Sequence, residues 1–333
     1  MKKEVLYENN EKTNNNIREI SIEGLPMIGR GANGEIYRLD EDKIVKVYNP
    51  TTNTLERIQR EKQSAKAAFI HDIPSAISYN IIKTDDRYGI IYELVNAQTL
   101  GQYITNNPEQ LEEYGKKMAD LLKKLHSTEF EPGVLPDARK NLQVWVDIAE
   151  KSGYYTNEVI SKLRNLINNI PFQNTFIHGD FHPGNIMVVN GELMLIDMTD
   201  VSVGNPIIEL LGSYQIMKLV PQRKGGAERY TGMSNENLSK LWNVFIQEYT
   251  GITDKNEQQA YEQKLKFYAL IRSLPGITFS ELVPKEVLPH LTQEVSKAFL
   301  GRYDIVTGIE KSEKDTSETK KSGESQEFND MER

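Results

Sequence analysis

The spacing of hydrophobic residues changes near residue 100, and this change divides the chain into two parts. Residues 20–48 and 79–95 contain short apolar or alternating runs separated by turn residues, which is typical of β-strands. One stretch with helical spacing, about residues 53–70, lies between them. Beyond about residue 108, apolar residues recur every three or four positions, which predicts helices over 109–127, 137–151, 156–169, 206–219, 234–250, 256–273 and 284–300, with a further β-rich stretch at 175–197.

This pattern predicts an α+β chain with two lobes. We expect a small antiparallel-sheet lobe with one helix at residues 20–98, followed by a larger and mainly helical lobe at residues 99–309. Residues 1–19 are expected to be a flexible lead-in. Residues 310–333 mix both charge signs with Ser, Thr and Gly and have almost no apolar residues, which favours a disordered tail over the alternative of a docking tail.

Composition narrows the class of protein. The 333 residues are 38% hydrophobic and 26% charged, as in ordinary globular proteins. The net charge of -8 argues against nucleic acid as a partner, and the lack of a long apolar run argues against a membrane span. The chain has no cysteine, which excludes disulfides, thiolate nucleophiles and Cys-ligated zinc. The N-terminus also lacks the apolar core of a signal peptide, so we expect a cytoplasmic protein.

Three glycines in G-x-G-x-x-G spacing, Gly29, Gly31 and Gly34, form a candidate nucleotide-binding loop. A dinucleotide-binding fold would need a helix to begin at the third glycine. The residues that follow, EIYRLDEDKIVKVY, alternate and contain β-branched side chains, which predicts a hairpin. The pattern therefore favours a glycine loop between two antiparallel strands that covers the phosphates of ATP, with a plain β-turn as the alternative.

A lysine and a glutamate are candidates for a phosphate-binding ion pair. Lys46 lies in the apolar strand IVKVY, and Glu61 lies within the apolar stripe of the helix that follows. A carboxylate on such a stripe needs a cationic partner, because burial of an unpaired charge is unfavourable. The pair would direct Lys46 toward the α- and β-phosphates, whereas the alternative is a Glu61 at the edge of the stripe that reaches solvent. We expect the stripe to consist of Ile58, Ala65, Ala68 and Phe69.

The segment HGDFHPGN, residues 178–185, is followed by a strong hairpin signal. Asn190-Gly191 is typical of a two-residue turn, and counting back from it pairs residue 189 with 192 and residue 185 with 196. Asn185 and Asp197 would therefore emerge side by side at the open end of the hairpin. An amide oxygen and a carboxylate are ligands suited to Mg²⁺, which takes its other ligands from phosphates and water.

Asp180 lies in the loop just before this hairpin and is the candidate proton acceptor. Phosphoryl transfer requires positioned charges rather than covalent chemistry, so a carboxylate that orients the attacking hydroxyl is sufficient. His178 and His182 could suggest zinc, but the sequence offers no further His or Cys at a spacing that completes a tetrahedral site. We expect His178 to orient the loop and leave the role of His182 open.

At this point the sequence resembles a known group of enzymes. HGDFHPGNIMV followed by LMLID is similar to the H-G-D-x-x-x-x-N and I-D motifs of the aminoglycoside phosphotransferase and choline kinase superfamily, which has a protein-kinase-like fold. The likeness extends to IGRGANGEIYRL, IVKVY, LHS (125–127) and GNPIIEL (204–210), and so covers about residues 27–212. The resemblance implies ATP- and Mg²⁺-dependent phosphorylation of a hydroxyl on a small molecule.

Two departures from the superfamily pattern affect this interpretation. The segment usually written G-D-P-x-x-D-L has Asn205 and Glu209 at its acidic positions. The sequence also has DMT in place of the D-F-G of protein kinases, and only seven residue steps separate Asp197 from Gly204. Because this leaves no long activation segment for a protein substrate, a small-molecule acceptor is favoured over a Ser/Thr protein kinase. A nucleotide-binding regulatory protein without turnover is a further alternative, which retention of Asp180 disfavours.

The remaining expectations concern the two ligands. The segment YELVNAQ (92–98) should hold the purine through backbone groups near Glu93 and Val95. Acidic residues near the site would suit an acceptor that bears amines, although a sugar or an amino alcohol fits the same pattern. The acceptor pocket is expected between residues 128–170 and the helices beyond residue 206. The side chains considered for these roles are the acidic Asp200 and Glu209 and the aromatic Trp145, Tyr154 and Tyr155, with the protein core as the alternative place for the aromatic residues.

Overall fold

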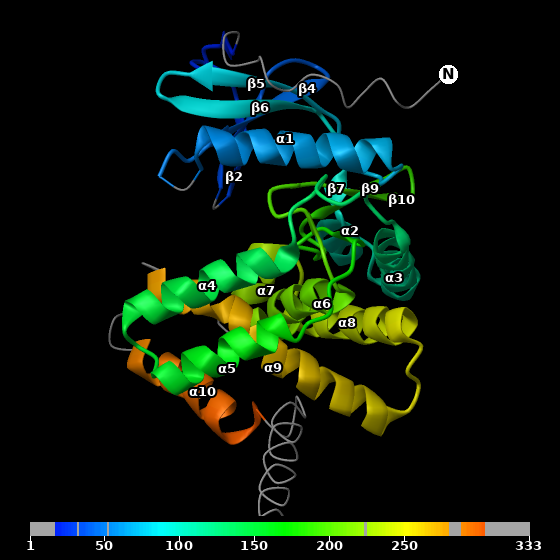
Figure 1. Ribbon diagram of the computed structural model, residues 1–333. Helices are drawn as coiled ribbons and strands as arrows, with labels where there is room; N and C mark the ends of the chain where they lie inside the picture. The colour runs from blue at the N-terminus through cyan, green and yellow to red at the C-terminus, as the bar shows by residue number, and fades with distance from the viewer. Residues whose placement is uncertain (1–16, 32, 52, 223–224, 280–287, 304–333) are drawn as a thin grey trace, which may run out of the picture.

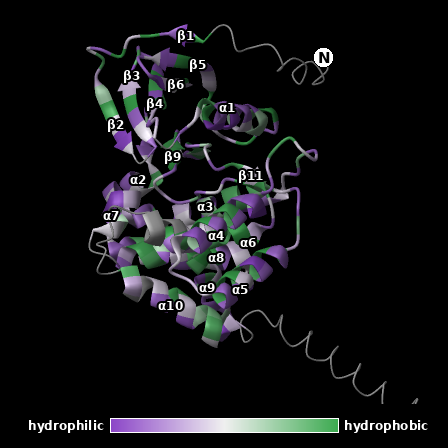
Figure 2. Ribbon diagram, turned by 60° about the vertical axis from the view of Figure 1, so that its left-hand side comes forward, coloured by the Kyte–Doolittle hydropathy of each residue, from purple (hydrophilic) through white to green (hydrophobic). Residues whose placement is uncertain are grey.

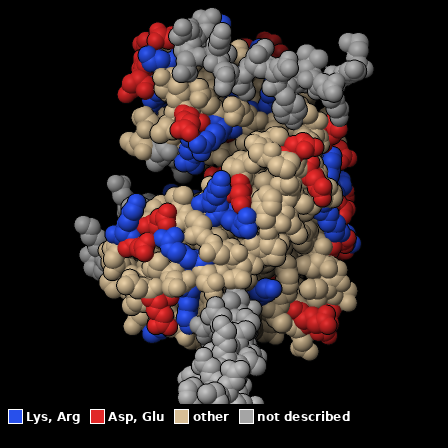
Figure 3. Space-filling view, viewed as in Figure 1, with Lys and Arg blue, Asp and Glu red and all other residues tan. Residues whose placement is uncertain are grey.

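The chain folds into two lobes, a sheet with one helix and a larger helical lobe (Figure 1). The structure, a computed structural model, describes residues 17–31, 33–51, 53–222, 225–279 and 288–303. Most of the expected lead-in and all of the expected tail at residues 310–333 lie outside the described residues. The surface is hollowed between the lobes at the left of Figure 3, and basic and acidic side chains are interspersed over that face.

The first lobe is built on a six-stranded sheet. Its strand order is β1-β5-β6-β4-β3-β2, and every neighbouring pair is antiparallel except β1 with β5. Strand β4 is the centre of the lobe, because it pairs with β3 on one side and β6 on the other. The strands are β1 (Arg18–Glu19), β2 (Met27–Gly31), β3 (Gly34–Arg38), β4 (Lys43–Tyr48), β5 (Ser78–Thr84) and β6 (Arg87–Glu93).

Helix α1 (Leu55–Ile70) packs on one face of this sheet (Figure 1). The helix begins at Thr54, whose side chain accepts a hydrogen bond from the Arg57 amide. Of the expected apolar stripe, Ile58, Ala65 and Ala68 are buried, together with Glu61. The expectation for Phe69 is wrong, since this side chain is 59% exposed. It lies in the last turn of the helix, where it lines a shallow cavity instead of the sheet.

The second lobe consists mainly of helices, and its core lies where they face one another (Figure 2). Helices α2 and α7 are too short to give a periodic signal and were not expected from the sequence. The expected helix 206–219 is helical throughout but changes to a π-helical turn at Gln215–Leu219. The helices are α2 (Leu100–Asn106), α3 (Leu111–Ser127), α4 (Ala138–Ser152), α5 (Asn157–Asn168), α6 (Pro206–Tyr214), α7 (Gly226–Thr231), α8 (Asn235–Thr250), α9 (Lys255–Phe279) and α10 (Leu288–Gly301).

Short strands occupy the part of the second lobe that faces the sheet. Strands β9 (Ile186–Val189) and β10 (Glu192–Leu195) form a hairpin, to which β7 (Gln98–Thr99) adds a third strand. Strand β8 (Phe176–Ile177) precedes this hairpin in the sequence and strand β11 (Ser202–Val203) follows it. The two pair with each other in a separate sheet. Among the described residues, no helix combines the length and the apolar character that a membrane crossing requires.

Candidate active site

The β9–β10 hairpin has the register that its turn predicts. Asn190 and Gly191 both have positive φ, 52° and 84°, as a type I′ turn requires. Val189 pairs with Glu192, and the ladder runs back to Ile186 with Leu195. Beyond it, the Ile196 amide donates to the Asn185 carbonyl over 3.0 Å. The ladder therefore places Asn185 and the chain just before Asp197 side by side.

Asp180 and Asn185 are in direct contact. The Asn185 side-chain amide donates to Asp180 Oδ2 over 2.9 Å and to the Asp180 carbonyl over 3.0 Å. Because Nδ2 is used twice in this way, Oδ1 of Asn185 is the atom left for another ligand. His182 Nε2 lies 3.4 Å from the same Asp180 oxygen. The 178–185 loop thus folds its own polar side chains around Asp180.

Lys46 forms a bridge between the two lobes. Its Nζ lies 3.0 Å from Glu61 Oε1 on α1 and 3.0 Å from Asp197 Oδ1 after the hairpin. Tyr92 donates to the same Glu61 oxygen over 2.8 Å, which fixes the buried carboxylate. Burial alone would lower the pKa of Lys46, but the charges of Asp197 and Glu61 outweigh it and raise that pKa above its ordinary value. The lysine is therefore charged at neutral pH.

Thr199 belongs to this cluster and was missed by the sequence analysis. Its hydroxyl lies 2.8 Å from Glu61 Oε2 and 2.5 Å from Asp197 Oδ1, and Lys46 donates to it over 3.4 Å. A hydroxyl has one proton, so it donates to one of the two carboxylates at a time. The only signal in the sequence was its position two residues after Asp197.

Asp197 has the backbone and charge properties of a ligand-binding residue. Its φ of 61° lies in the left-handed region, which costs a non-glycine residue about 1 kcal/mol and is typical of functional sites. Burial opposes ionisation, yet Lys46 holds the pKa of this carboxyl below its usual value. Lys46 and Thr199 both contact Oδ1, and Oδ2 has no hydrogen-bond partner in the described part of the chain. Oδ2 of Asp197 and Oδ1 of Asn185 are thus two uncommitted hard oxygens, a donor set that fits Mg²⁺.

The two residues at the acidic positions of the superfamily pattern, Asn205 and Glu209, have separate roles. Glu209, which is 1% exposed, accepts from the His178 amide over 2.5 Å and from the Gly179 amide over 3.1 Å. Burial raises the pKa of Glu209, and these backbone donors partly offset that effect. Asn205 caps α6 by accepting from the Ile207 amide over 3.0 Å. The glutamate therefore fastens the 178–185 loop from α6, while the asparagine starts the helix.

His178 also acts within the loop. It is fully buried, and its Nε2 lies 3.1 Å from the Ile196 carbonyl at the end of the hairpin. The Asp180 amide lies 3.3 Å from its Nδ1. These contacts are those of a residue that orients the loop. Among the described residues, no group of three His, Cys, Asp or Glu side chains is arranged to hold a metal by itself.

Arg272 on α9 is a second residue that the sequence analysis missed. Its Nη2 lies 2.5 Å from Asp180 Oδ1, and its Nη1 donates to the Gly179 carbonyl. Burial opposes ionisation of Asp180, but the charge of Arg272, aided by His182, lowers the pKa of Asp180 well below its usual range. The chain separates these partners by 92 residues. No local pattern could have indicated the contact.

The glycine loop is a turn between two antiparallel strands. Strand β3 begins at Gly34 and pairs with β2, so no helix starts at the third glycine. A Cβ on Gly34, which has a φ of 155°, would stand 2.1 Å from the Val47 carbonyl oxygen. A Cβ on Gly29 would make ordinary contacts, and one on Gly31 would meet nothing within 4 Å. The fold therefore requires only the third glycine.

The expected purine-binding segment joins the lobes after β6. The Glu93 amide donates to the Ile77 carbonyl over 3.0 Å, and the Glu93 carboxylate accepts from the Ile77 amide over 2.7 Å. The Val95 carbonyl accepts from Ala97 over 2.9 Å. The amide of Glu93 is thus already used within the protein, so this group is not free to hold a purine.

The three candidate aromatic residues occupy different places. Tyr155 is buried in the core of the helical lobe, whereas Tyr154 is 46% exposed. Trp145 lines a small cavity beside the 178–185 loop. The lining of this cavity also includes Asn141 of α4, Asp200 and Arg272. Of the three, only Trp145 lies next to Asp180 and its neighbours.

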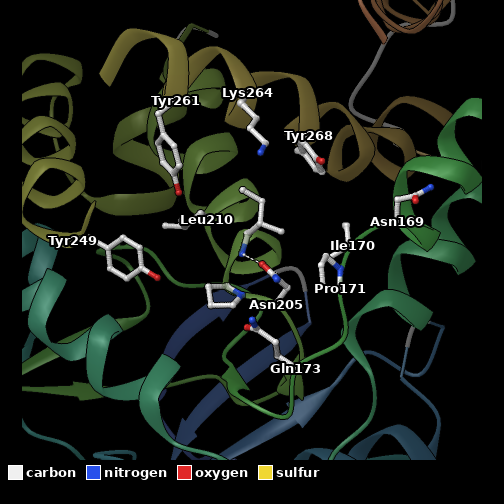
Figure 4. Close-up of a pocket in the computed structure, with 12 residues that line it drawn as sticks. Asn169, Ile170, Pro171, Gln173, Asn205, Leu210, Tyr249, Tyr261, Lys264 and Tyr268 are labelled. Carbon is white, nitrogen blue, oxygen red and sulfur yellow. Dashed lines mark hydrogen bonds between the residues drawn. The ribbon is translucent and has the colours of Figure 1, made fainter. Parts of the chain in front are cut away.

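A larger cavity of about 400 Å³ lies at the start of α6 (Figure 4). Tyr261, Lys264 and Tyr268 line it from α9, and Asn205 lines it from the α6 cap. Its lining includes none of the residues around Asp180, Lys46 and Asp197. This cavity is therefore separate from the candidate active site.

The fold is similar to that of solved aminoglycoside phosphotransferases. The structure is similar to that of ADP-bound aminoglycoside phosphotransferase APH(2'')-Ib, with a TM-score of 0.54 and 18% identity over 85% of this chain and 94% of that one. It is also similar to an aminoglycoside-3'-phosphotransferase of type VIII, with a TM-score of 0.50 and 16% identity over 75% and 93% of the two chains. These similarities show a protein-kinase-like, two-lobe α+β fold, as the sequence predicts.

The sequence then identifies the family. Residues 26–235 match the model of the phosphotransferase enzyme family, APH. The chain therefore belongs to this family, in agreement with the resemblance of its motifs. A comparison with curated protein sequences finds no match.

Proposed function

We propose that the protein is a small-molecule kinase that uses ATP and Mg²⁺ to phosphorylate a hydroxyl group. The observation that carries the proposal is the convergence of Lys46, Asp180 and Asp197 at the junction of the two lobes. Lys46 is held by Glu61 and Asp197, and Asp180 is held by Asn185 beside the same hairpin. A charged lysine, a hydroxyl-orienting carboxylate and metal-binding oxygens are the groups that phosphoryl transfer requires.

Each residue has a defined part in the proposed reaction. Lys46 binds the α- and β-phosphates, and the turn between Gly31 and Gly34 covers the phosphates. Asp180 orients the acceptor hydroxyl and takes its proton while the oxygen attacks the γ-phosphorus and ADP leaves. Asn185 and Asp197 hold Mg²⁺, which when bound neutralises phosphate charge.

Nucleotide binding also has support from the structural neighbours. One similar structure, with a TM-score of 0.50 and 11% identity over 87% of this chain and 95% of that one, is a GDP and kanamycin complex of an APH(2'') enzyme. Another is bound to ADP. The glycine loop lies within residues 26–235, which match the family model, and a Cβ on Gly31 would meet nothing within 4 Å. Glycine at a place where the fold does not require it favours close approach of a ligand.

The acceptor is proposed to be a compound of the aminoglycoside, amino alcohol or sugar type. The Asp200 side chain, which is 45% exposed, lines the same small cavity as Trp145. Its Oδ1 lies 3.6 Å from Nη2 of Arg57. A partly exposed carboxylate at this place suits an amine on the acceptor. The short connection from Asp197 through β11 to α6 leaves no segment on which a protein substrate would dock.

The test is transfer of label from [γ-³²P]ATP in the presence of Mg²⁺ to a panel of acceptors. The panel contains kanamycin, choline and glucose, with casein as a protein acceptor. We expect a labelled small molecule, with an amine-bearing acceptor preferred to glucose. Label on casein alone would contradict the proposal in favour of a protein kinase. Stabilisation by nucleotide without any transfer would favour a non-catalytic nucleotide-binding protein.

A further inference from the structure

We propose that Arg272 is a positioning residue for phosphoryl transfer, which holds the Asp180 carboxylate in the orientation that receives the acceptor hydroxyl. The proposal rests on the proposed function, since it takes Asp180 as the proton acceptor. Arg272 comes from α9, a helix outside both the glycine loop and the hairpin. The Arg272 side chain contacts the 178–185 loop at Gly179 and Asp180.

The contact of Arg272 with the loop has two points. Nη2 lies 2.5 Å from Asp180 Oδ1, and Nη1 donates to the Gly179 carbonyl. A planar guanidinium with two donors engaged fixes direction as well as distance, which a lysine cannot do. Asn185 meanwhile contacts the other carboxylate oxygen, Oδ2, over 2.9 Å. Both oxygens of Asp180 are thus held by neighbouring side chains, and Oδ1, which only Arg272 contacts among the described residues, retains a lone pair for the acceptor hydroxyl.

Gly179, the residue before Asp180, is also held at both its amide and its carbonyl. Glu209 accepts from the Gly179 amide over 3.1 Å, while Arg272 donates to the Gly179 carbonyl. Gly179 has a φ of 86°, and a Cβ there would stand 2.5 Å from the Asp200 carbonyl oxygen. The backbone therefore occupies a conformation that only glycine adopts readily, and two side chains from different helices maintain it.

A glycine in helix α6 leaves space for the Arg272 guanidinium. A Cβ on Gly212 would stand 2.5 Å from Arg272 Nη1. Glycine is unfavourable in the interior of a helix relative to alanine, so its presence here needs a steric reason. Gln215, at the start of the π-helical turn that follows α6, donates to Ser273 over 3.2 Å, next to Arg272 on α9. The gap at Gly212 and this hydrogen bond set the register of α9 against α6 at the height of the loop.

These contacts separate the role of Arg272 from nucleotide binding. Arg272 contacts Gly179 and Asp180. The groups proposed to bind the nucleotide and its metal, Lys46 and Asp197, form an ion pair with each other instead. Loss of the arginine should therefore reduce the rate of transfer and leave the binding of ATP intact. A displacement of the carboxylate by 1 Å is enough to reduce a rate about 100-fold.

The test compares Arg272→Gln, Arg272→Lys and Arg272→Ala with the control Arg164→Gln. Arg164 on α5 also pairs with carboxylates, those of Asp147 and Glu150, but it lies outside the site. Turnover is measured with Mg·ATP and the acceptor identified by the panel, or as ATP hydrolysis if water is the only acceptor. We expect kcat to fall about 100-fold in Arg272→Gln with an unchanged KM for ATP.

Two further readouts distinguish positioning from a structural role. Free guanidinium should restore part of the kcat of Arg272→Ala and none of that of Arg272→Gln, whose side chain fills the space. Gly212→Ala should also lower kcat, because the added methyl would displace the guanidinium from Asp180. A wild-type kcat in Arg272→Gln, or an equal loss in Arg164→Gln, would overturn the proposal.

A double-mutant cycle on Tm tests the contact between Arg272 and Asp180 independently of turnover. It therefore still applies if the wild type transfers no phosphate, a result that would refute the proposed function. Arg272→Gln should lower Tm by about 5 °C, because it leaves Asp180 partly buried without its cation. Adding Asp180→Asn should recover most of that loss. Additive Tm shifts in the double variant would mean that the two side chains are not coupled and would overturn the inference on Arg272.

Discussion

At the scale of single residues, the site depends on charges that satisfy one another across long stretches of sequence. Lys46 is shared between Glu61 and Asp197, and Asp180 is shared between Asn185 and Arg272. These cations offset the unfavourable burial of the carboxylates, and they hold the pKa values of Asp180 and Asp197 below their usual range. Single substitutions should therefore affect ligand binding and transfer separately, according to which carboxylate they leave unpaired.

Thr199→Val should weaken the binding of Mg·ADP about tenfold. The substitution removes the hydroxyl that contacts both Glu61 and Asp197, and a hydrogen bond to a charged group contributes about 1.5–3 kcal/mol. Thr199→Ser keeps the hydroxyl and is the matched control, which should bind like the wild type. Isothermal titration calorimetry measures both. Equal affinity of the valine variant and the wild type would show that Thr199 has no part in the site.

Burial of His126 should make the protein less stable in mild acid. Burial lowers the pKa of His126 to about 3, so the native state stays neutral while the unfolded chain binds a proton below its ordinary pKa of about 6.5. Because the unfolded state then holds more protons, the free energy of unfolding falls by about 2 kcal/mol between about pH 7.5 and about pH 5.

His126→Gln removes this titration and keeps a polar atom for Tyr249, which His126 Nδ1 contacts at 2.7 Å. Denaturant unfolding at the two pH values measures the effect. The variant should lose about 2 kcal/mol less than the wild type over the same interval. An identical pH dependence of the two proteins would show that His126 is not held neutral by burial.

At the scale of elements, the sequence predicts what is local and misses what is not. The Asn190-Gly191 turn fixes the hairpin register, because a two-residue loop and two short apolar strands leave no other pairing. Helix α1 was expected within two residues of its start, and its buried carboxylate was identified from the apolar stripe. Arg272 lies inside an expected helix, but its partner is 92 residues away, and helical spacing does not indicate tertiary contacts.

The glycine loop gives a matched pair of predictions. Gly34→Ala should destabilise the protein by about 1–3 kcal/mol, because its Cβ would lie 2.1 Å from the Val47 carbonyl oxygen. Gly31→Ala should leave stability unchanged, since that position has open space, but should raise the KM for ATP. Thermal melts and initial-rate kinetics on both variants measure this. A Gly31→Ala protein with wild-type KM would contradict nucleotide approach at this turn.

At the scale of the whole molecule, the two lobes meet through shared side chains such as Lys46 and through backbone hydrogen bonds of Leu195 with Pro74 and Ala76. The expected α+β architecture with its lobes in this order is confirmed by the structure and its relatives. The bounds of the lobes stay a prediction, and so do the roles of the individual site residues. Alternation and helical spacing report which elements form, whereas the closeness of Lys46 to Asp197 depends on how the lobes pack. The family motifs indicated that arrangement, whereas Thr199 is the last residue of the DMT that replaces D-F-G, and Arg272 lies outside the quoted motifs.

The central claim is that Asp180 takes the proton of an acceptor hydroxyl in an ATP-dependent transfer. Asp180→Asn tests it most directly, because the amide keeps the size of the side chain and cannot accept the proton. We predict that the variant binds Mg·ATP with the wild-type Kd. Its rate of label transfer from ATP should be about 10²- to 10⁴-fold lower than that of the wild type. Transfer at the wild-type rate by a correctly folded Asp180→Asn protein would contradict the account.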